Sequence, residues 1–517
     1  MNLSAANTAA APRASASAAS RHVAASATQP AASTNGAPEH VDVAIVGGGP
    51  AGLLAAKGIQ QALPRKTVRV LEAASGYWPQ GAGVLIDVNG WRALHAVDDD
   101  LAEKMRARGF LFGVTRLYDW AGKSKESQYV SGAWNHEENL RVHGHTSVMV
   151  HGHTSVMVHW GDIRQTLYEA LPPGTVAFNS RTVGVTPGRA GGEPATLQLQ
   201  DAKTGEAHAL TAGLVVACDG YFSRVKRQLW NGEGLPAFHD KLIWRAVVEY
   251  GSPEDVPPLL VESGGDPLLW LGDGFPPDRS STAYAVVPGK RYVWTCIAST
   301  SFLKEKGMGW ATRDAGDAGI HQTGTSGACP KERCLAVFAD YPPELRDLIA
   351  RTDPRAVSEH GYYMHDYDKL QGAPDWVRGN VVLIGDAAHT APPDGMGLNM
   401  AWEDAAVLAA TLQARGVTTE ALQAYAEARL PRVLDVWQRP PGVANPPRRR
   451  AAVAAASFVP LAGAAASGRS MPPPPPAAAE PIVGVPEVTE PVVVASAGPD
   501  NAPKAATAAA PATAAPA

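Results

Sequence analysis

The stretch VDVAIVGGGPAG, residues 41–52, decides the fold of this 517-residue chain. Its first half predicts a β-strand that runs into a glycine turn, and Pro50 marks the start of a helix. In the spacing G-x-G-x-x-G, Gly47 allows a tight turn, Gly49 lets the backbone approach a pyrophosphate, and Gly52 lets the helix pack close to the strand. The helix would direct its free N–H groups at that diphosphate. The predicted cofactor contacts in this stretch are Gly47, Gly49, Pro50, Ala51 and Gly52.

A second short apolar strand, residues 67–72, ends in Glu72, 20 residues after Gly52. A carboxylate at this place accepts hydrogen bonds from ribose hydroxyls and would repel a 2′-phosphate. The pattern therefore favours the adenosine ribose of FAD or NAD over that of NADP. The alternative, a glycine-rich turn that arose by chance, does not explain why two strands, a helix and an acid follow in this order.

Two later apolar strands also end in an acid. Residues 214–218 lead to Asp219-Gly220 and then to basic side chains, a pattern that a strand with a surface turn would also show. Residues 380–384 lead to Gly385-Asp386. In the stretch that follows, prolines stiffen the turn, glycines permit close backbone approach, and a helix start can stabilise negative charge near a flavin N1–C2 carbonyl. The cofactor-binding candidates in that stretch are Pro393, Gly395, Gly397, Leu398 and Asn399.

The two ends of the chain have compositions that cannot build a core. Residues 1–39 are rich in Ala and Ser, contain arginines and have no acid before Glu39, which is typical of a transit peptide and favours import into an organelle, a chloroplast in particular. A plain disordered tail on a cytoplasmic protein is the alternative. Residues 440–517 are rich in Pro and Ala and predict a second disordered tail.

Charge and cysteine content exclude several classes of protein. A formal net charge of −5 gives no reason to expect nucleic acid as a partner. No apolar stretch is long enough for a membrane-spanning helix, although peripheral membrane contact stays open. The four cysteines form no C-x-x-C pair, which fits a reducing compartment.

Residues 142–157 contain the eight-residue unit VHGHTSVM twice in succession. His-x-His on a strand places two rings on one face, which is compatible with a metal site. The perfect copy and the lack of an acid or Cys ligand inside it favour a duplication instead, so we predict no metal.

Residues 232–350 are rich in Pro and Gly, with alternating runs that contain Trp, and predict a β-rich second domain. We therefore expect the nucleotide domain to comprise residues 40–231 and 351–439. A substrate pocket is commonly built where two such domains meet.

Together these motifs resemble the single-component, class A FAD-dependent monooxygenases, a family that includes salicylate hydroxylase-like and zeaxanthin epoxidase-like enzymes. The similarity covers about residues 40–432 in order and spacing. Its matching positions are Gly47 to Gly52, Glu72, Cys218 to Ser223, Gly385 to His389, Pro393, Gly397, Asn399, Glu403, Asp404, Tyr425, Arg429 and Arg432.

The resemblance implies an α/β fold with a Rossmann-like FAD-binding domain and a β-sheet substrate domain. It assigns Glu72 to the adenosine ribose, Asp386 to the ribityl chain, and Asp219 to a region shared by FAD and NAD(P)H. Members of the family reduce FAD with NAD(P)H, let O2 add at the flavin C4a atom, and transfer one oxygen to an aromatic or conjugated substrate. This chemistry belongs to the cofactor, and the protein orients it and excludes water.

Two positions are expected to serve the reaction itself. Arg245 corresponds to an arginine that faces flavin and substrate in some relatives, and the alternative is a surface arginine on a strand. The reactive end of FAD is expected near Pro393. Where many members of the family carry an arginine, this chain has Trp160, so a guanidinium that contacts FAD is either missing or replaced by Arg164. His389 follows the Gly-Asp turn and has either a functional role or a structural one, such as holding that loop by a hydrogen bond.

Two other functions compete with a monooxygenase. An FAD-dependent reductase or dehydrogenase of the same fold would transfer hydride without inserting oxygen. A catalytically silent interaction protein would use the long tails to bind partners, and would carry no flavin.

Overall fold

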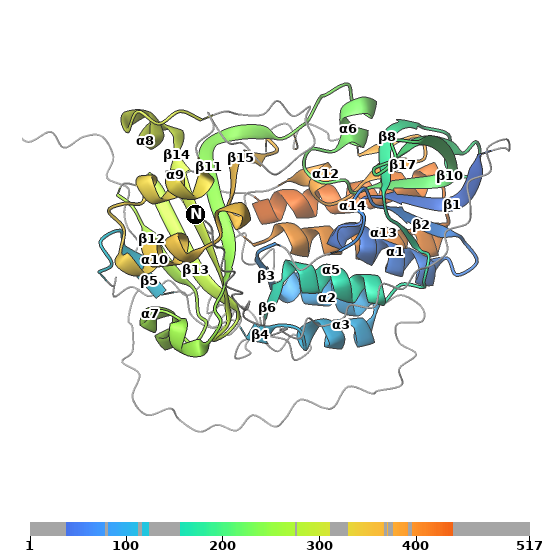
Figure 1. The fold of residues 1–517 in the computed structure, drawn as a ribbon. Coiled ribbons are helices and arrows are strands. Elements are labelled where there is room, and N and C mark those ends of the chain that lie inside the picture. The colour runs from blue at the N-terminus through green and yellow to red at the C-terminus, as the bar shows by residue number, and fades with distance from the viewer. Residues whose placement is uncertain are drawn as a thin grey trace, which may run out of the picture. The chain divides into compact units, whose positions relative to one another are not determined.

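The computed structural model describes residues 38–77, 81–111, 116–123, 156–273, 277–310, 329–366, 370, 376–390 and 395–437, which are coloured in Figure 1. Three expectations lie mostly or wholly outside the described residues: the two disordered tails with the transit peptide, the duplicated stretch at 142–157, and Pro393. They stay predictions.

Eight strands of the described chain form the first sheet. They are Glu39–Val46 (β1), Val68–Leu71 (β2), Val176–Ala177 (β7), Ser180–Thr186 (β8), Ala195–Asp201 (β9), Ala207–Ala217 (β10), Val377–Arg378 (β16) and Val381–Leu383 (β17). The main order is β16-β17-β10-β1-β2-β7, and β8 and β9 extend it beside β10.

The three strands that precede the predicted acids, β2, β10 and β17, lie parallel to β1 at the centre of this sheet, and β1 separates β2 from β10. In register, Val46 at the end of β1 pairs with Leu71 of β2 and with Ala217 of β10, which in turn pairs with Leu383 of β17. The carboxyl-terminal halves of these strands are buried, as expected for a parallel sheet, whereas β1 and β10 begin with exposed residues. Since parallel strands end at the same edge, the residues that follow all four strands gather there.

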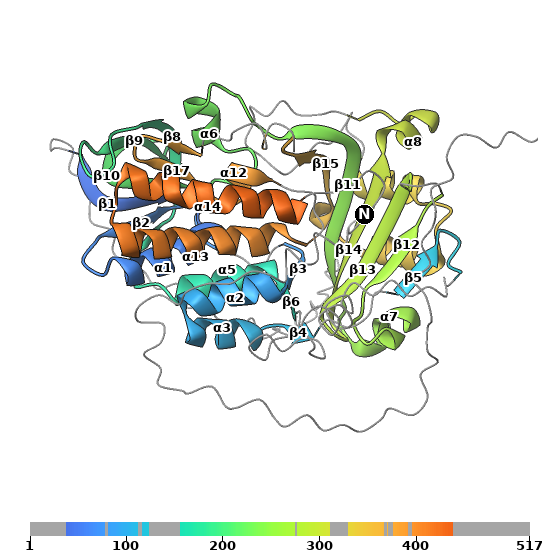
Figure 2. The same cartoon turned by 180° about the vertical axis from the view of Figure 1, so that it is seen from behind.

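Helices pack against this sheet and against one another (Figures 1 and 2). Their bounds are Pro50–Ala62 (α1), Val88–Val97 (α2), Asp99–Arg106 (α3), Trp160–Glu169 (α5), Gly397–Arg415 (α13) and Thr419–Trp437 (α14). The small buried residues of α1 allow α13 to lie alongside it, and the Trp402 indole N–H of α13 donates to the Pro50 carbonyl at 3.2 Å. Helix α13 also contacts α2 and α14, so it is the central helix of the layer.

The second sheet has six described strands in the order β15-β11-β14-β13-β12-β5. They are Arg116–Asp119 (β5), Ala237–Glu249 (β11), Leu268–Leu271 (β12), Arg279–Val287 (β13), Arg291–Ser299 (β14) and Ser358–Met364 (β15). Strands β11 to β14 lie within residues 232–350, together with several short helices. Strands β5 and β15 join from outside that range, because backbone pairing at a sheet edge accepts a strand from any part of the chain.

The two faces of the second sheet have different neighbours. One face buries Trp244, Trp270 and Trp294. It packs against short helices with bounds Pro258–Glu262 (α7), Thr300–Glu305 (α8), Pro330–Val337 (α9) and Pro343–Arg351 (α10). The other face contributes Val247 and Tyr284 to a small apolar cluster with Met157.

Met157 belongs to a three-stranded sheet that is continuous with the nucleotide-binding part of the chain. Its strands are Gly83–Ile86 (β3), Phe110–Leu111 (β4) and Val156–His159 (β6). The Tyr284 hydroxyl donates to the Gly83 carbonyl at 3.1 Å. This contact ties the second sheet to the segment between β2 and α2.

Within the described ranges, no helix is both long and apolar enough to cross a membrane. The same part of the chain contains no group of three or more His, Cys, Asp or Glu residues that could hold a metal ion.

Candidate functional site

The glycine turn after β1 leaves one of its three glycines open to a ligand. A Cβ on Gly47, whose φ is 108°, would lie 2.5 Å from the Cys218 carbonyl oxygen, and a Cβ on Gly52 would lie 2.1 Å from the Gly47 carbonyl oxygen. Packing therefore requires glycine at both positions. A Cβ on Gly49 would meet nothing within 4 Å.

Gly49 is also the N-cap of α1, and no side chain caps that end of the helix. The first N–H groups of a helix need acceptors, and the helix dipole favours an anion there. Open space in front of an uncapped helix of 13 residues fits the diphosphate of a dinucleotide. This geometry agrees with the roles predicted for Gly49, Pro50, Ala51 and Gly52.

Glu72 follows β2 and holds the glycine turn. Its two carboxylate oxygens accept from the backbone N–H groups of Gly48 at 2.8 Å and Ala74 at 2.7 Å. Each oxygen keeps a second lone pair, which is what a ribose hydroxyl would use. The Tyr77 hydroxyl donates to the Gly48 carbonyl at 2.7 Å, so a residue that the sequence did not single out supports the same turn.

Arg164 lies beside this group. Its guanidinium carbon is 5.1 Å from the centre of the Tyr77 ring, a cation–π contact. The pKa of Arg164 is lowered, chiefly by burial, and the neighbouring Tyr77 and Glu72 oppose that lowering. Trp160 instead packs against Gly81, where a Cβ would lie 2.8 Å from the indole. The predicted replacement, Arg164, is therefore near the ribose-binding candidate, and Trp160 is not placed there by any contact in the described chain.

Asp219 is occupied by its own turn. Its carboxylate accepts from the Ser223 hydroxyl at 2.5 Å and from the backbone N–H groups of Arg224 and Val225 at 2.7 and 3.3 Å, at the start of the helix Arg224–Leu229 (α6). Burial raises the pKa of Asp219, and these donors oppose that rise. The structure gives this carboxylate a local capping role, and its predicted role toward FAD and NAD(P)H stays a prediction.

Asp386 has the opposite environment. It opens the short helix Asp386–His389 (α12), and within the described chain no donor reaches its carboxylate. Burial raises the pKa of Asp386, with His389 lowering it and Asp404 raising it. A half-buried carboxylate that lacks a protein donor fits the hydroxyl groups of a ribityl chain, because those hydroxyls would supply the missing hydrogen bonds.

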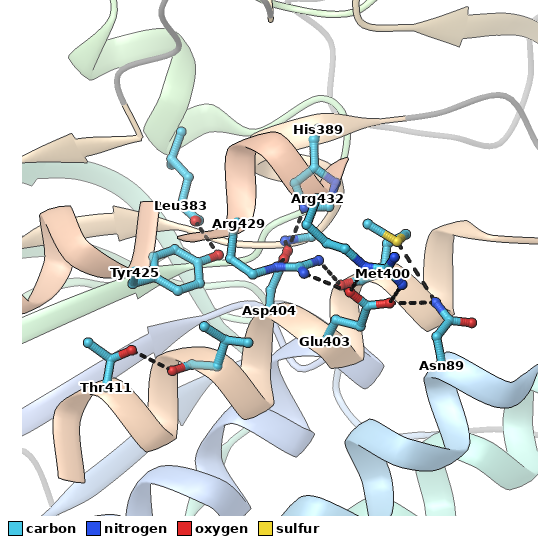
Figure 3. A network of polar contacts seen from close by, with 12 residues as sticks. Asn89, Leu383, His389, Met400, Glu403, Asp404, Thr411, Tyr425, Arg429 and Arg432 are labelled. Carbon is cyan, nitrogen blue, oxygen red and sulfur yellow. Dashed lines mark hydrogen bonds and ion pairs between the residues drawn. The ribbon is translucent and has the colours of Figure 1, made fainter. Parts of the chain in front are cut away.

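Buried contacts from α13 hold the turn that carries Asp386 (Figure 3). One Asp404 oxygen accepts from the Gly385 N–H at 2.7 Å and lies 2.5 Å from His389 Nε2. Of the two roles considered for His389, this contact supports the structural one, because it joins the loop to α13. Gly385 has a φ of 59°, a conformation that a glycine adopts without strain.

Asn399 joins the start of α13 to the segment after β3. Its amide oxygen accepts from the Asp87 N–H at 2.9 Å, and its amide nitrogen donates to the carbonyls of Leu85 and Gly395 at 2.9 and 2.8 Å. These contacts leave the Asn399 side chain as a positioning group. The neighbouring glycine Gly395 has a φ of 90° and open space around it, which keeps its predicted access to a ligand.

Tyr221 lies between the second sheet and the edge of the first sheet at which the parallel strands end. Its pKa is raised to about 12, chiefly by burial, and Arg245 lowers it while Asp386 and Tyr363 raise it. Arg245 also lowers the pKa of Tyr284, which burial raises. Arg245 alternates with Val247 along β11, so it lies on the face that meets Met157 and not on the tryptophan face.

A family model described as an FAD binding domain matches residues 40–247 and 353–440. The chain belongs to this family of FAD-binding proteins. Its cofactor is FAD, and it is an FAD-dependent monooxygenase.

Two curated relatives and one solved structure illustrate the similarity. The chain is 29% identical over 401 residues to 3-amino-4-hydroxybenzoate 2-monooxygenase of Streptomyces platensis, covering 77% of this chain and 86% of the relative. It is 25% identical over 380 residues to 6-hydroxynicotinate 3-monooxygenase of Bordetella bronchiseptica, covering 73% and 84%. The structure of Klebsiella pneumoniae HpxO with FAD and uric acid matches with a TM-score of 0.57 at 19% identity, covering 80% and 88%, and shows a shared fold.

The Asp386→Asn variant is expected to bind FAD about tenfold to hundredfold more weakly, because it removes hydrogen bonds to a charged group. The apoprotein should be as stable as wild type or more stable, since a half-buried carboxylate without a donor is replaced by a neutral amide. Flavin fluorescence titration and thermal unfolding of the apoprotein measure the two effects. Asp219→Asn is the control, and it should lower the melting temperature because its carboxylate accepts three bonds. An Asp386→Asn protein with wild-type FAD affinity would contradict the assignment.

Proposed function

We propose that this monooxygenase hydroxylates a small aromatic or conjugated, largely apolar molecule with NAD(P)H and O2. The observation that carries the proposal is the position of Arg245, whose charge acts on Tyr221 together with that of Asp386. Arg245 on the second sheet and Asp386, the candidate for binding the ribityl chain, therefore both lie near Tyr221. A substrate bound to Arg245 would therefore lie near the turn that carries Asp386, where the flavin is expected.

The reaction consumes one NAD(P)H, one proton and one O2 for each substrate, and it yields NAD(P)+, water and the hydroxylated product. Bound FAD supplies the electron transfer and the activation of O2. The chain orients its partners: Arg245 pairs with an anionic group of the substrate, and the apolar residues Val247 and Met157 on the same side keep water out. The two relatives act on hydroxylated aromatic acids, as their names state, and such acids carry the anion that an arginine recognises.

The proposal is tested by measuring substrate-stimulated NAD(P)H oxidation over a panel of phenolic, quinone and polyene compounds. We expect an aromatic acid or phenol to stimulate oxidation and to yield product that contains one oxygen from ¹⁸O2. Rapid oxidation of reduced enzyme by a non-oxygen acceptor, with no hydroxylated product from any compound, would instead indicate a reductase.

The Arg245→Gln variant is expected to raise KM for an anionic substrate about tenfold to hundredfold, because a charge-assisted hydrogen bond is lost. FAD content should not change. Lys290→Gln, at an exposed site beside β14, is the control and should leave KM at the wild-type value. A KM for Arg245→Gln equal to that of the control would remove Arg245 from the substrate site.

The composition of residues 1–39 supports a further proposal, import into an organelle such as a chloroplast. Imaging of a fluorescent protein fused behind these residues tests it, and diffuse cytoplasmic fluorescence would contradict it.

A further inference from the structure

A buried lysine and a buried histidine meet next to the turn that carries Asp386. Lys226 of α6 is 6% exposed and His365, directly after β15, is 5% exposed. The Lys226 Nζ lies 2.8 Å from His365 Nε2 and 3.3 Å from the Ala388 carbonyl oxygen of α12. Neither residue belongs to a salt bridge with an acid in the described part of the chain.

The hydrogen bonds of His365 determine where the protons of this pair reside. The backbone N–H of Thr390 donates to His365 Nδ1 at 2.5 Å, so Nδ1 carries no proton. A neutral imidazole then carries its proton on Nε2 and donates it to Lys226 Nζ. An ammonium group has no lone pair and cannot accept that bond, so Lys226 must be a neutral amine in this arrangement.

Burial acts in the same direction as this hydrogen-bond pattern. It lowers the pKa of Lys226 to about 7, and burial together with Lys226 and His389 lowers the pKa of His365 well below its usual value. At a pH somewhat above neutrality both members are therefore uncharged.

The pair is joined to α12 on two sides. Lys226 donates to the Ala388 carbonyl, and His365 both accepts from the Thr390 N–H and donates its own backbone N–H to the Thr390 carbonyl at 3.0 Å. These bonds position the backbone immediately after Asp386. They come from α6 and the end of β15, whereas the Asp404 contacts to the same turn come from α13.

We propose that Lys226 and His365 form a neutral pair that positions the Asp386 turn, and that protonation of this pair weakens FAD binding. The inference rests on the assignment of FAD to this turn. Once protonated, Lys226 would face the Nε2–H proton of His365, so the bond between them is lost and the turn is released from α6. The ionisable groups on the elements around the pair include Arg224 and Arg227 of α6, Glu359, His360, Tyr362 and Tyr363 of β15, Asp366 beside His365, Asp386 and His389 of α12, and Asp404 of α13.

The sign of the pH dependence follows from the role proposed for the neutral pair. Since the neutral pair holds the turn that binds FAD, protons bind the FAD-free form more readily than the FAD-bound form. FAD affinity therefore falls as the pH falls below about 7, the value to which burial lowers the pKa of Lys226. A single proton limits the slope to about tenfold per pH unit. The unfolded chain, in which lysine titrates near 10.5, binds more protons between about pH 7 and 10.5, so this group makes the folded state more stable as the pH rises through that window.

The test is a fluorescence titration of the full-length apoprotein with FAD between about pH 5.5 and 8.5. Wild type should show a constant Kd above about pH 7.5 and a rise of up to about tenfold per pH unit below pH 7. Lys226→Met should bind FAD with little pH dependence over this range, because its side chain cannot titrate. Lys203→Met, at an exposed turn after β9, is the matched control and should keep the wild-type profile.

Two further measurements distinguish a role of the pair in positioning the Asp386 turn from a role in the stability of the whole fold. Lys226→Arg, whose guanidinium stays charged, should bind FAD weakly at every pH. Nitrogen-15 NMR of His365 in the wild-type apoprotein should show the proton on Nε2 near pH 8. An unchanged pH profile in Lys226→Met, or a proton on Nδ1, would overturn the proposal. If wild type binds FAD with the same Kd at all pH values, the role of the Lys226–His365 pair is overturned but the assignment of FAD is not. If wild type binds no FAD, the cofactor assignment is overturned as well.

Discussion

The Arg429→Met variant is expected to lower the free energy of unfolding by about 3–5 kcal/mol, because it leaves two buried carboxylates without their shared cation. Arg429 is 2% exposed, and its guanidinium donates to Asp404 Oδ1 and to Glu403 Oε2, each at 2.6 Å (Figure 3). Glu403 and Asp404 are 1% and 0% exposed. Burial alone would raise the pKa of both acids. Arg429 is the first of the groups that lower the pKa of Glu403, and His389 followed by Arg429 lowers the pKa of Asp404.

Urea unfolding of the apoprotein at neutral pH measures this loss. Arg432→Met is the matched control: Arg432 contacts Glu403 alone of the two acids, and Glu403 then keeps its bonds to Arg429 and to Asn89 at 2.7 Å. We expect the control to lose no more than about 1–2 kcal/mol. Equal losses in the two variants would show that Arg429 does not hold the pair of acids together.

Lowering the pH should change the stability of wild type and of Arg429→Met by different amounts. In wild type, the lowered pKa values of Glu403 and Asp404 contribute stability that is present above the unfolded-state values and is lost as the pH falls through the folded-state values. In Arg429→Met, burial without the cation raises the pKa, so an acid takes up a proton at a higher pH. The stability difference between the two proteins should therefore narrow as the pH falls.

The Gly49→Ala variant is expected to lose at least about 100-fold in FAD affinity while its apoprotein stays folded, a loss of about 2.7 kcal/mol. A Cβ at Gly49 meets no protein atom within 4 Å, so the apoprotein has room for it. The same methyl group would occupy the space through which a diphosphate approaches the helix start. The free energy of unfolding of the Gly49→Ala apoprotein, obtained from thermal unfolding, should lie within about 0.5 kcal/mol of the wild-type value.

Gly52→Ala is the contrasting variant, since its Cβ would lie 2.1 Å from the Gly47 carbonyl oxygen and 2.7 Å from the Cys218 sulfur. It should destabilise the apoprotein by about 1–3 kcal/mol, because the helix must move away from the strand. Flavin absorbance of the purified proteins and thermal unfolding separate the two variants. A Gly49→Ala protein that retains a full complement of FAD would contradict the placement of the diphosphate.

Local sequence patterns were enough to predict the edge of the first sheet at which the nucleotide is expected to bind. A strand, a tight turn and a helix start are encoded by neighbouring residues, so the roles of Gly47 and Gly52 in packing follow from their spacing. The acids after β2, β10 and β17 could also be read from the sequence, because apolar runs that end in an acid mark the carboxyl ends of buried strands. For His389 the sequence left a functional and a structural role open, and it did not indicate Asp404 as the partner.

The sequence by itself determined that three acids follow three parallel strands, and the tertiary structure decided what each acid does. Asp219 is satisfied by its own turn, Glu72 holds Gly48, and Asp386 has no donor in the described chain, a difference set by which N–H groups the folded backbone brings within reach. The Lys226–His365 pair joins residues 139 positions apart, and no periodicity records such a contact. The glycine turn at residues 41–52 is encoded locally, whereas the protonation of a buried lysine depends on desolvation and on partners that come together only when the chain folds.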